Sequence, residues 1–362
     1  MSEMIITEAI AEAAILGGAV LGGGGGGGMS NGRKNYREAL SLGDVRLVDV
    51  DDIPADTLLI TASAVGAPAA EEAHVGKEGY LRVIDLLIKN GCPKPGGFIP
   101  NECGGSSITN GWIPAALMGL PVVDALCNGR AHPTGTMGSM GLHRKPNYVS
   151  RQSAAGGNPE KGAYLEIYVE GTLESTAALV RAAADKAGGL VAVARNPVDA
   201  AFVKKNGACG ALKQAIRLGE RMLNAAHGGG EQVVSRVVEY LGGTIVTRGE
   251  VFSLELVTKG GFDSGIIAIG DCGTTFWNEF MTLERRGERL GTFPNLIMTL
   301  RGEDGLPVTT AELRKGQDVF LIHVPSEKLI LGEGMRCAEL MRSIEAVVEK
   351  EILPYIGSVL RT

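Results

Sequence analysis

One segment of the chain, residues 101–144, holds most of the side chains that could do chemistry. It reads NECGGSSITNGWIPAALMGLPVVDALCNGRAHPTGTMGSMGLHR, so carboxylates, thiols, imidazoles and a guanidinium stand among many glycines. Such side chains serve as acids, bases, nucleophiles and metal ligands, and glycine lets the backbone approach a ligand closely. We therefore expect the active site here, with catalytic roles for Asp124, Cys127, Asn128 and His132.

A metal centre is one form that this site could take. Cys127, His132 and His143 offer a thiolate and two imidazoles, and three protein ligands plus a water make a catalytic zinc site. Their spacing matches no standard zinc signature, so polar loop residues that fix the backbone are the alternative. Asp124 would orient a histidine or act as a general base, although an aspartate at a strand end is also a common cap. His74 is a further candidate ligand.

A metal-free site is the second form. Cys127 would then be the nucleophile and His132 its base, because a paired imidazole lowers the pKa of a thiol. Cys103 is a weaker candidate, since the carboxylate of its neighbour Glu102 disfavours a thiolate.

Backbone and polar groups near these residues are predicted to bind the substrate. Arg130 is expected to hold a substrate carboxylate in a two-pronged contact, the alternative being a salt bridge with Asp124. Seven consecutive glycines, residues 22–28, either approach a ligand closely or form a flexible connection, and no Walker lysine–serine pair follows them. N–H groups of the glycines after Cys103 could face an anion or a polarised carbonyl. The predicted substrate-binding residues are Asn101, Glu102, Gly104, Gly105, Asn110, Arg130, Gly25 and Gly26.

The elements that must position this segment alternate between strand and helix patterns. Alternation of this kind predicts an α/β domain with three layers and a largely parallel sheet. Asp124 and Cys127 would lie near the carboxyl end of a strand, where open α/β sheets place ligands. Strands are predicted at 45–50, 57–63, 120–126, 164–170 and 189–194, and helices at 7–15, 79–90, 113–119, 174–186, 196–206 and 211–226.

The pattern changes after residue 226. Short apolar segments divided by Gly and Pro turns recur from 244 to 331, which predicts a β-rich domain, and one amphipathic helix follows at 333–351. Residues 271–279, DCGTTFWNE, could touch a ligand, although a hairpin corner explains them nearly as well. The predicted division is an α/β domain carrying the site at 1–226, a β-rich domain at 227–332, and a C-terminal helix at 333–362 that packs back on a domain.

Composition favours a small molecule as the partner. The net charge is -6 and no basic block is present, which argues against nucleic acid. No apolar run reaches the roughly 20 residues that span a bilayer, and the opening residues lack the basic region of a secretory signal. The six cysteines form no CxxC pair and are expected to be free thiols. We predict a cytoplasmic homo-oligomer without nucleic-acid or membrane partners, with zinc as the candidate cofactor.

Several motifs carry a family resemblance: LGGGGGGG, PNECGGSSITN, GLPVVDALCNGRAHPTGTM, FWNEFMTLE and GTFPNLI. Through them the chain resembles the S-methyl-thiohydantoin desulfurase-like family over nearly its whole length. The resemblance implies an α/β N-terminal domain, a β-rich C-terminal domain, and hydrolytic removal of sulphur from a substituted thiohydantoin with release of methanethiol. Against the pattern of many relatives, Leu126 replaces an aspartate, His132 an aromatic residue, Thr134 a glutamate and Asn295 an aspartate, which allows a different substrate.

A hydrolase acting on a hydantoin- or thiohydantoin-like heterocycle is therefore the expected function. Water, activated by a metal at His132 and His143 or by Asp124 as base, would attack the ring carbon that bears sulphur, with glycine-loop N–H groups stabilising the developing charge. One alternative is a non-catalytic ligand-binding or accessory subunit of a hydantoinase-type complex. Another is a ring isomerase or racemase that uses Cys127 and a second thiol.

Overall fold

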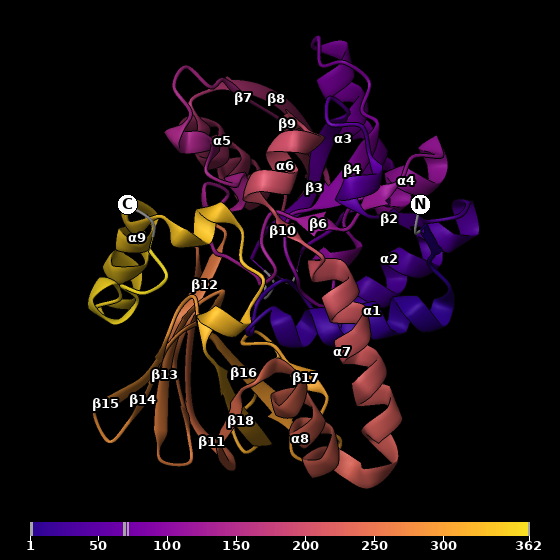
Figure 1. The fold of residues 1–362 in the computed structure, drawn as a ribbon. Helices are drawn as coiled ribbons and strands as arrows, with labels where there is room; N and C mark the ends of the chain where they lie inside the picture. The colour runs from indigo at the N-terminus through magenta and orange to yellow at the C-terminus, as the bar shows by residue number, and fades with distance from the viewer. Residues whose placement is uncertain (1–2, 68–69, 71, 361–362) are drawn as a thin grey trace.

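Two large sheets organise the molecule, and the first carries the α/β part (Figure 1). The structure is a computed structural model that describes residues 3–67, 70 and 72–360. The strand order across the first sheet is β1-β2-β5-β4-β3-β9-β7-β8. The bounds of these strands are β1 (Met4–Ile5), β2 (Arg46–Val48), β3 (Leu58–Gly66), β4 (Gly97–Pro100), β5 (Val122–Val123), β7 (Ser150–Gly156), β8 (Leu165–Gly171) and β9 (Leu190–Asp199).

Parallel pairing is concentrated at the centre of this sheet. β2, β5, β4 and β3 pair in parallel, whereas β1, β9, β7 and β8 join through antiparallel pairs. β7 is two antiparallel steps from β3 and so runs in the same direction, which makes five of the eight strands parallel in sense (β2, β3, β4, β5 and β7). The predicted α/β class with a largely parallel sheet is confirmed, with antiparallel strands toward both edges.

Helices cover both faces of the first sheet. Along β9, Ala192 and Ala194 pack in the apolar cluster that includes α3, whereas Val191 and Val193 pack with α5. Successive side chains of a strand point to opposite faces, so α3 and α5 form the two outer layers and the three-layer prediction is confirmed. The described helices are α1 (Glu8–Leu21), α2 (Met29–Leu42), α3 (Lys77–Lys89), α4 (Trp112–Met118), α5 (Leu173–Lys186), α6 (Ala200–Asn206), α7 (Ala211–Ala225), α8 (Gly229–Leu241) and α9 (Ala338–Val348).

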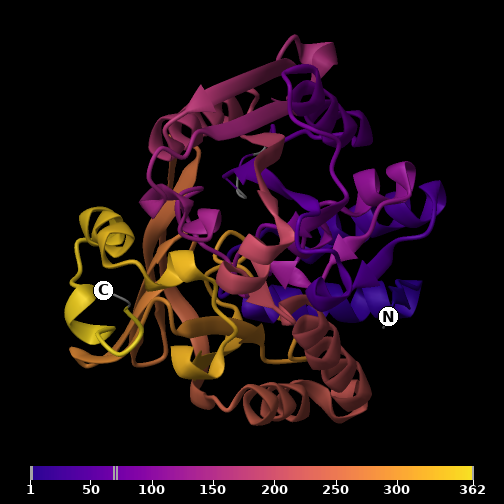
Figure 2. The ribbon, with the colours of Figure 1, turned by 45° about the horizontal axis from the view of Figure 1, so that its top comes forward.

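The second sheet is antiparallel throughout and confirms the β-rich C-terminal part. Its strand order is β15-β14-β13-β12-β11-β18-β16-β17. Helix α9 contacts β12 and β13, and the C-terminal segment lies beside these strands in Figure 2. The bounds are β11 (Thr244–Lys259), β12 (Phe262–Ile269), β13 (Cys272–Trp277), β14 (Glu279–Arg285), β15 (Glu288–Thr292), β16 (Leu296–Arg301), β17 (Pro307–Val308) and β18 (Asp318–Val324).

Helix α1 lies between the two sheets and is buried along most of its length (Figure 1). It contacts β16 and β17 of the second sheet and packs closely on α7. A Cβ atom added to Gly17 would lie 1.9 Å from the carbonyl oxygen of Ala215, and one added to Gly219 would lie 1.8 Å from that of Ala13. Both positions therefore require glycine for this helix contact to form.

Four predicted elements differ from the structure. The helix predicted at 7–15 continues to Leu21 as α1. The strand predicted at 120–126 is two strands, because β5 belongs to the first sheet while β6 (Ala125–Leu126) pairs with β10 (Ala208–Cys209). Residues 196–199 extend β9 instead of starting a helix. The helix predicted at 333–351 is a 3-10 turn (Glu333–Arg336) followed by the shorter α9, which ends where Glu349 adopts a positive φ.

Helix α8 was not predicted, because the glycines before it read as a break in the chain. The domain limits 1–226, 227–332 and 333–362 stay a prediction, and they include residues 1–2, 68–69, 71 and 361–362, which lie outside the described residues.

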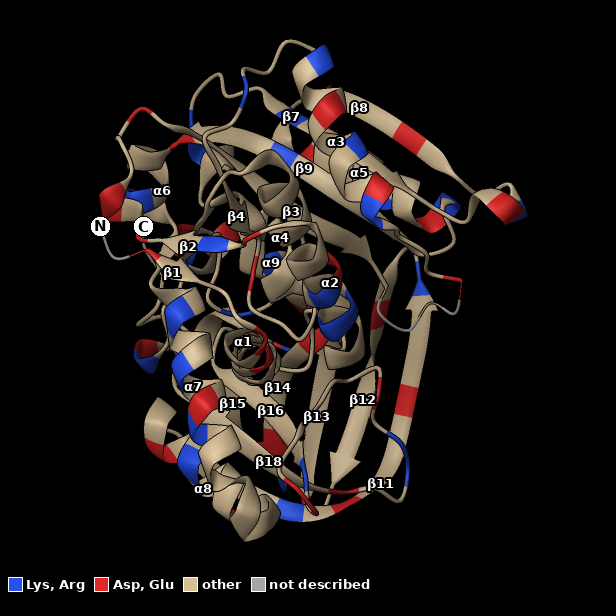
Figure 3. Cartoon of the chain, turned by 90° about the vertical axis from the view of Figure 1, so that its right-hand side faces the viewer, with Lys and Arg blue, Asp and Glu red and all other residues tan. Residues whose placement is uncertain are grey.

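Within the described part of the chain, no helix has the length and apolar character needed to cross a membrane. Figure 3 shows Lys and Arg interspersed with Asp and Glu along α7.

Candidate functional site

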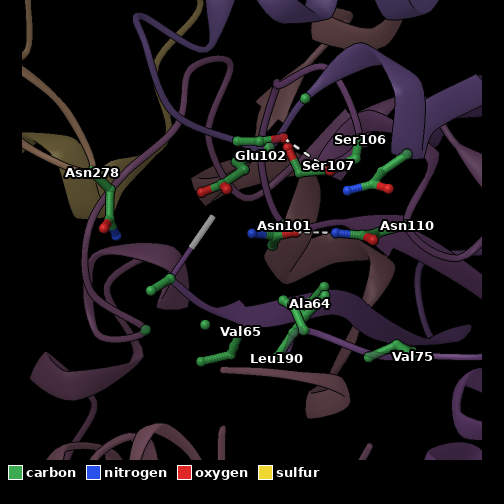
Figure 4. Close-up of a pocket in the computed structure, with 18 of the residues that line it drawn as sticks. Ala64, Val65, Val75, Asn101, Glu102, Ser106, Ser107, Asn110, Leu190 and Asn278 are labelled. Carbon is green, nitrogen blue, oxygen red and sulfur yellow. Dashed lines mark hydrogen bonds between the residues drawn. The ribbon is translucent and has the colours of Figure 1, made fainter. Parts of the chain in front are cut away.

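A cavity of about 190 Å³ lies at the carboxyl ends of β3 and β4. Asn101 and Glu102 follow β4 directly, and Ala64 and Val65 stand near the end of β3. Figure 4 shows these two polar residues on one side and Ala64, Val65 and Leu190 across from them. The cavity therefore offers a polar wall and an apolar wall at the edge where open α/β sheets bind ligands.

Glu102 is held on the polar wall by His132. Its Oε2 lies 2.9 Å from the ring Nδ1 of His132 and accepts the backbone N–H of His132 at 3.2 Å. Nδ1 also lies 3.2 Å from Nδ2 of Asn128. A hydrogen bond to a carboxylate is the stronger of the two, so Nδ1 carries the proton, and Asn128 donates instead to the carbonyl oxygen of Met137 at 3.2 Å. Glu102 and His132 both line the cavity, whereas Asn128 stands behind them.

An amide pair extends the polar wall. Oδ1 of Asn101 accepts a hydrogen bond from Nδ2 of Asn110 at 2.9 Å, and both residues line the cavity. Nδ2 of Asn101 remains as a donor and points away from Asn110 in Figure 4. The structure thus brings the predicted residues Asn101, Glu102, Asn110 and His132 together around one space.

The second sheet contributes Asn278 and Glu279 to the cavity. These are two of the residues whose sequence, DCGTTFWNE, was compatible with a ligand contact. Glu279 is 2% exposed, and its Oε2 finds no hydrogen-bond partner among the described residues. Burial, followed by the negative charge of Glu102, raises the pKa of Glu279 well above its ordinary value. The cavity therefore holds one carboxyl group that favours the protonated form and another that is bound to an imidazole.

The glycine run packs between this carboxyl group and the loop that follows Cys103. Gly26 lines the cavity, whereas a Cβ atom added to Gly25 would lie 2.2 Å from Oε1 of Glu279. A Cβ atom added to Gly104 would lie 2.4 Å from the Cα atom of Gly26. Gly104 and Gly105 consequently stand behind the glycine run and outside the cavity lining, which corrects their predicted contact with substrate.

Asp124 lies away from the cavity and caps a helix. Its Oδ1 accepts the backbone N–H groups of Leu212 and Lys213 at 3.0 and 3.2 Å, in the first turn of α7. Burial raises the pKa of Asp124, while these two hydrogen bonds act in the opposite direction. Asp124 therefore has the geometry of a cap, which was the alternative to a general base. Its position outside the cavity gives the general-base role no support.

Cys127 is also separated from the cavity. It is fully buried in an apolar cluster, and its Sγ lies 3.4 Å from Oγ1 of Thr61. Burial raises the pKa of its thiol to about 11, which disfavours the thiolate that a nucleophile needs. Cys103, likewise buried, has a raised pKa for the same reason.

Arg130 serves the packing of the two sheets rather than the cavity. Its guanidinium donates to the backbone carbonyl oxygens of Ala131 at 3.3 Å, of Pro294 at 3.1 Å and of Asn295, and it lies over the ring of Phe293. The predicted substrate contact is corrected accordingly, because these acceptors hold the side chain outside the cavity lining. The predicted alternative, a salt bridge with Asp124, does not form either, since Asp124 is bound to α7.

The three predicted zinc ligands are not brought together. His132 faces the cavity and Cys127 is enclosed in the apolar cluster, while Nε2 of His143 lies 2.8 Å from Oε1 of Glu339. The spacing of these residues along the sequence did not reveal that α9 approaches the turn around His143.

A different group of side chains has spacing compatible with a metal. Within the described ranges, His143, Cys337 and Glu339 place one ligand atom each within 4.8 Å of one another. Both oxygens of Glu339 already accept hydrogen bonds from Arg144, at 2.6 and 2.7 Å. The cluster lies outside the cavity lining and ties α9 to the end of the site segment.

Two arginines in the cavity were missed by sequence reasoning. Arg195 is a residue of β9, where a charge inside the apolar run VAVARNPV was an available signal. Arg181 belongs to α5, whose other charges made it look like an ordinary surface residue. His74, a candidate metal ligand, lines the same cavity.

Comparison with known proteins gives the family. The chain matches the model described as S-Me-THD-like, N-terminal domain over residues 11–159 and the model described as S-Me-THD-like, C-terminal domain over residues 172–338. The crystal structure of a protein from Chromobacterium violaceum has the same fold, with a TM-score of 0.69 and 20% identity over 95% of this chain and 96% of that chain. No functionally curated protein matches. The two family models together span most of the sequence, which confirms the resemblance: the chain belongs to the S-Me-THD-like family.

Proposed function

We propose that the protein is a hydrolase that acts on a small hydantoin- or thiohydantoin-like heterocycle, using Glu102 as the base that activates water. The observation that carries this proposal is the Glu102–His132 pair in a cavity that also contains Glu279. One carboxylate is fixed by two N–H groups, and the other carboxyl group favours its protonated form. A carboxyl group that stays protonated can act as the acid beside a carboxylate that acts as the base.

The reaction proceeds at the ring carbon that bears sulphur. Glu102 takes a proton from water as its oxygen bonds to this carbon, and Glu279 protonates the adjacent ring nitrogen. The carbon–sulphur bond then breaks, methanethiolate leaves and takes a proton from Glu102, and the remaining hydroxyl proton returns to Glu279. The S-methyl-thiohydantoin and one water thus become a hydantoin and methanethiol. Both carboxyl groups return to their initial protonation states.

The two walls orient the ring in this reaction. Nδ2 of Asn101 can donate to a ring carbonyl, since its own oxygen is already bonded to Asn110. The apolar wall of Ala64, Val65 and Leu190 suits the ring face and the S-methyl group. His132 is a positioning residue here, because it acts through Glu102.

The metal-compatible cluster has no part in this reaction, because His143, Cys337 and Glu339 lie outside the cavity lining. We further propose a cytoplasmic location and a homo-oligomeric assembly, as predicted from the sequence.

Purified wild-type protein incubated with an S-methyl-thiohydantoin tests the activity. Methanethiol is measured with a thiol reagent and the hydantoin by mass spectrometry, in water enriched in oxygen-18. The expected result is equimolar release of both products, with one labelled oxygen in the hydantoin. Tight binding without product would contradict catalysis and favour the ligand-binding subunit.

A further inference from the structure

Arg195 is a buried cation without a direct ion-pair partner among the described residues. It is 2% exposed, it forms no ion pair with any described residue, and its Nε donates to no acceptor among them. Glu102 is the carboxylate whose charge it senses, but that carboxylate is bonded to His132. A buried guanidinium without a partner destabilises a fold. Because Arg195 lines the cavity, a bound ligand can provide the missing acceptor.

Arg130 is also a buried arginine without an ion pair among the described residues, but its surroundings differ. Arg130 is equally buried, yet backbone carbonyl oxygens of Ala131, Pro294 and Asn295 accept its hydrogen bonds. Its remaining Nη2 has no hydrogen-bond partner among the described residues either, but this atom lies against Gly23 and Arg130 is outside the cavity lining. The contrast separates an arginine that completes the packing from one that faces the ligand space.

A second guanidinium adds positive charge to the same cavity. Arg181 lines the cavity, and backbone carbonyl oxygens of Gly66, Gly261 and Pro133 accept its hydrogen bonds at 2.9, 2.7 and 3.1 Å, so it contributes its charge more than free donors. A Cβ atom added to Gly135 would lie 2.8 Å from Nη1 of Arg195, so the loop of residues 133–135 lies over both arginines. Burial, followed by the positive charge of Arg195, lowers the pKa of Arg181, and a bound anion would offset the repulsion between the two guanidinium groups. A planar guanidinium fits a carboxylate through two parallel hydrogen bonds.

We propose that Arg195, supported by Arg181, binds a carboxylate of the ligand, so that the substrate is a heterocycle with an anionic carboxylate substituent. This inference rests on the proposed function for the identity of the ring. It gives Arg195 the binding role that the sequence had suggested for Arg130.

The test uses two product analogues that differ in one group: a hydantoin with a carboxyalkyl side chain, and the same molecule as its primary amide. Their dissociation constants are measured by calorimetry for wild type, Arg195→Gln and Thr134→Glu. Thr134 lines the cavity next to Pro133 and Gly135, so a glutamate there would place a competing carboxylate beside the arginines. Arg217→Gln, on the exposed side of α7, is the matched control.

The carboxylate ligand should bind about tenfold or more weakly to Arg195→Gln and to Thr134→Glu, as expected for loss of a charge-assisted contact. The amide should bind all four proteins within about threefold of one another. Equal losses for the two ligands would show that Arg195 only shapes the cavity, and unchanged carboxylate binding by Thr134→Glu would contradict the subsite even if Arg195→Gln does not fold.

A ring-free dicarboxylate, glutarate, separates this inference from the proposed function. If wild type binds neither hydantoin, the proposed function fails, and the glutarate titration decides the subsite alone. Glutarate binding that is lost in Thr134→Glu supports the subsite, whereas absence of glutarate binding to wild type overturns it.

Discussion

Two pairs of reactive residues come from the same segment and have opposite surroundings. Glu102 and His132 bond to each other on the wall of a cavity. Asp124 and Cys127 lie between them in the sequence, yet one caps α7 and the other is enclosed in an apolar cluster. The two pairs contain side chains of similar chemistry, but they occupy different positions in the fold.

The difference arises where the chain leaves the first sheet. Asp124 lies between β5 and β6, so its side chain meets the first turn of α7. Glu102 and Asn128 form a parallel bridge just beyond the ends of β4 and β6, which brings the loop carrying His132 over Glu102. Residues of similar chemistry thus face either the cavity or the first turn of α7, depending on which segment packs against the strand end that they follow. The predictions below test this division.

The largest loss of activity is expected for Glu102→Gln. The amide cannot take a proton from water, so kcat for thiol release should fall by about 10²- to 10⁴-fold. Substrate binding should change little, and unchanged thermal unfolding would show that the fold is intact. A variant with wild-type kcat would remove the cavity pair from the chemistry.

Glu279→Gln should lower kcat by about 10²-fold, because the acid that protonates the ring is lost. In wild type the rate should fall as pH rises through the raised pKa of Glu279, and this alkaline decline should be absent in the variant.

The pH dependence of stability tests the raised pKa of Glu279 independently of activity. Unfolded Glu279 ionises near 4.5 and the folded one at higher pH, so the unfolded chain binds fewer protons between these values.

The free energy of unfolding of wild type should therefore fall as pH rises across that window, and that of Glu279→Gln should fall less. Urea titrations at a series of pH values measure both. Parallel pH dependences for the two proteins would contradict a raised pKa for Glu279.

His132→Asn should lower kcat by about tenfold, because Glu102 loses the ring that positions it. In the Glu102→Gln background the same substitution should have little further effect, since the two residues act as a unit. Additive losses in the double variant would show that His132 acts independently of Glu102.

Asp124→Ala should change stability and leave activity nearly unchanged. Loss of the cap on α7 should lower the free energy of unfolding by about 1 kcal/mol, while kcat/KM stays within about threefold of wild type. Urea unfolding and thiol release provide the two measurements. A selective loss of activity with normal stability would return Asp124 to the list of candidate bases.

The sequence predicted the α/β class, the second β-rich sheet and the segment that forms the polar wall, because these follow from local periodicity and residue chemistry. The role of Asp124 could not be predicted, since it depends on α7 packing against the end of β5 from nearly 90 residues away. That of Cys127 depends likewise on distant parts of the chain, because residues of β3, β9 and α6 enclose it. Arg195 was hidden for the same reason: a charged residue in an apolar strand is a signal, but only the folded sheet shows that it faces the cavity and not a carboxylate.

The most direct test compares kcat/KM for methanethiol release by Glu102→Gln and Cys127→Ala in one assay. If the chemistry belongs to the cavity, Cys127→Ala should remain within about threefold of wild type while Glu102→Gln loses at least about 10²-fold. Loss of turnover in Cys127→Ala, with Glu102→Gln still active, would contradict the account and restore the buried thiol as the nucleophile.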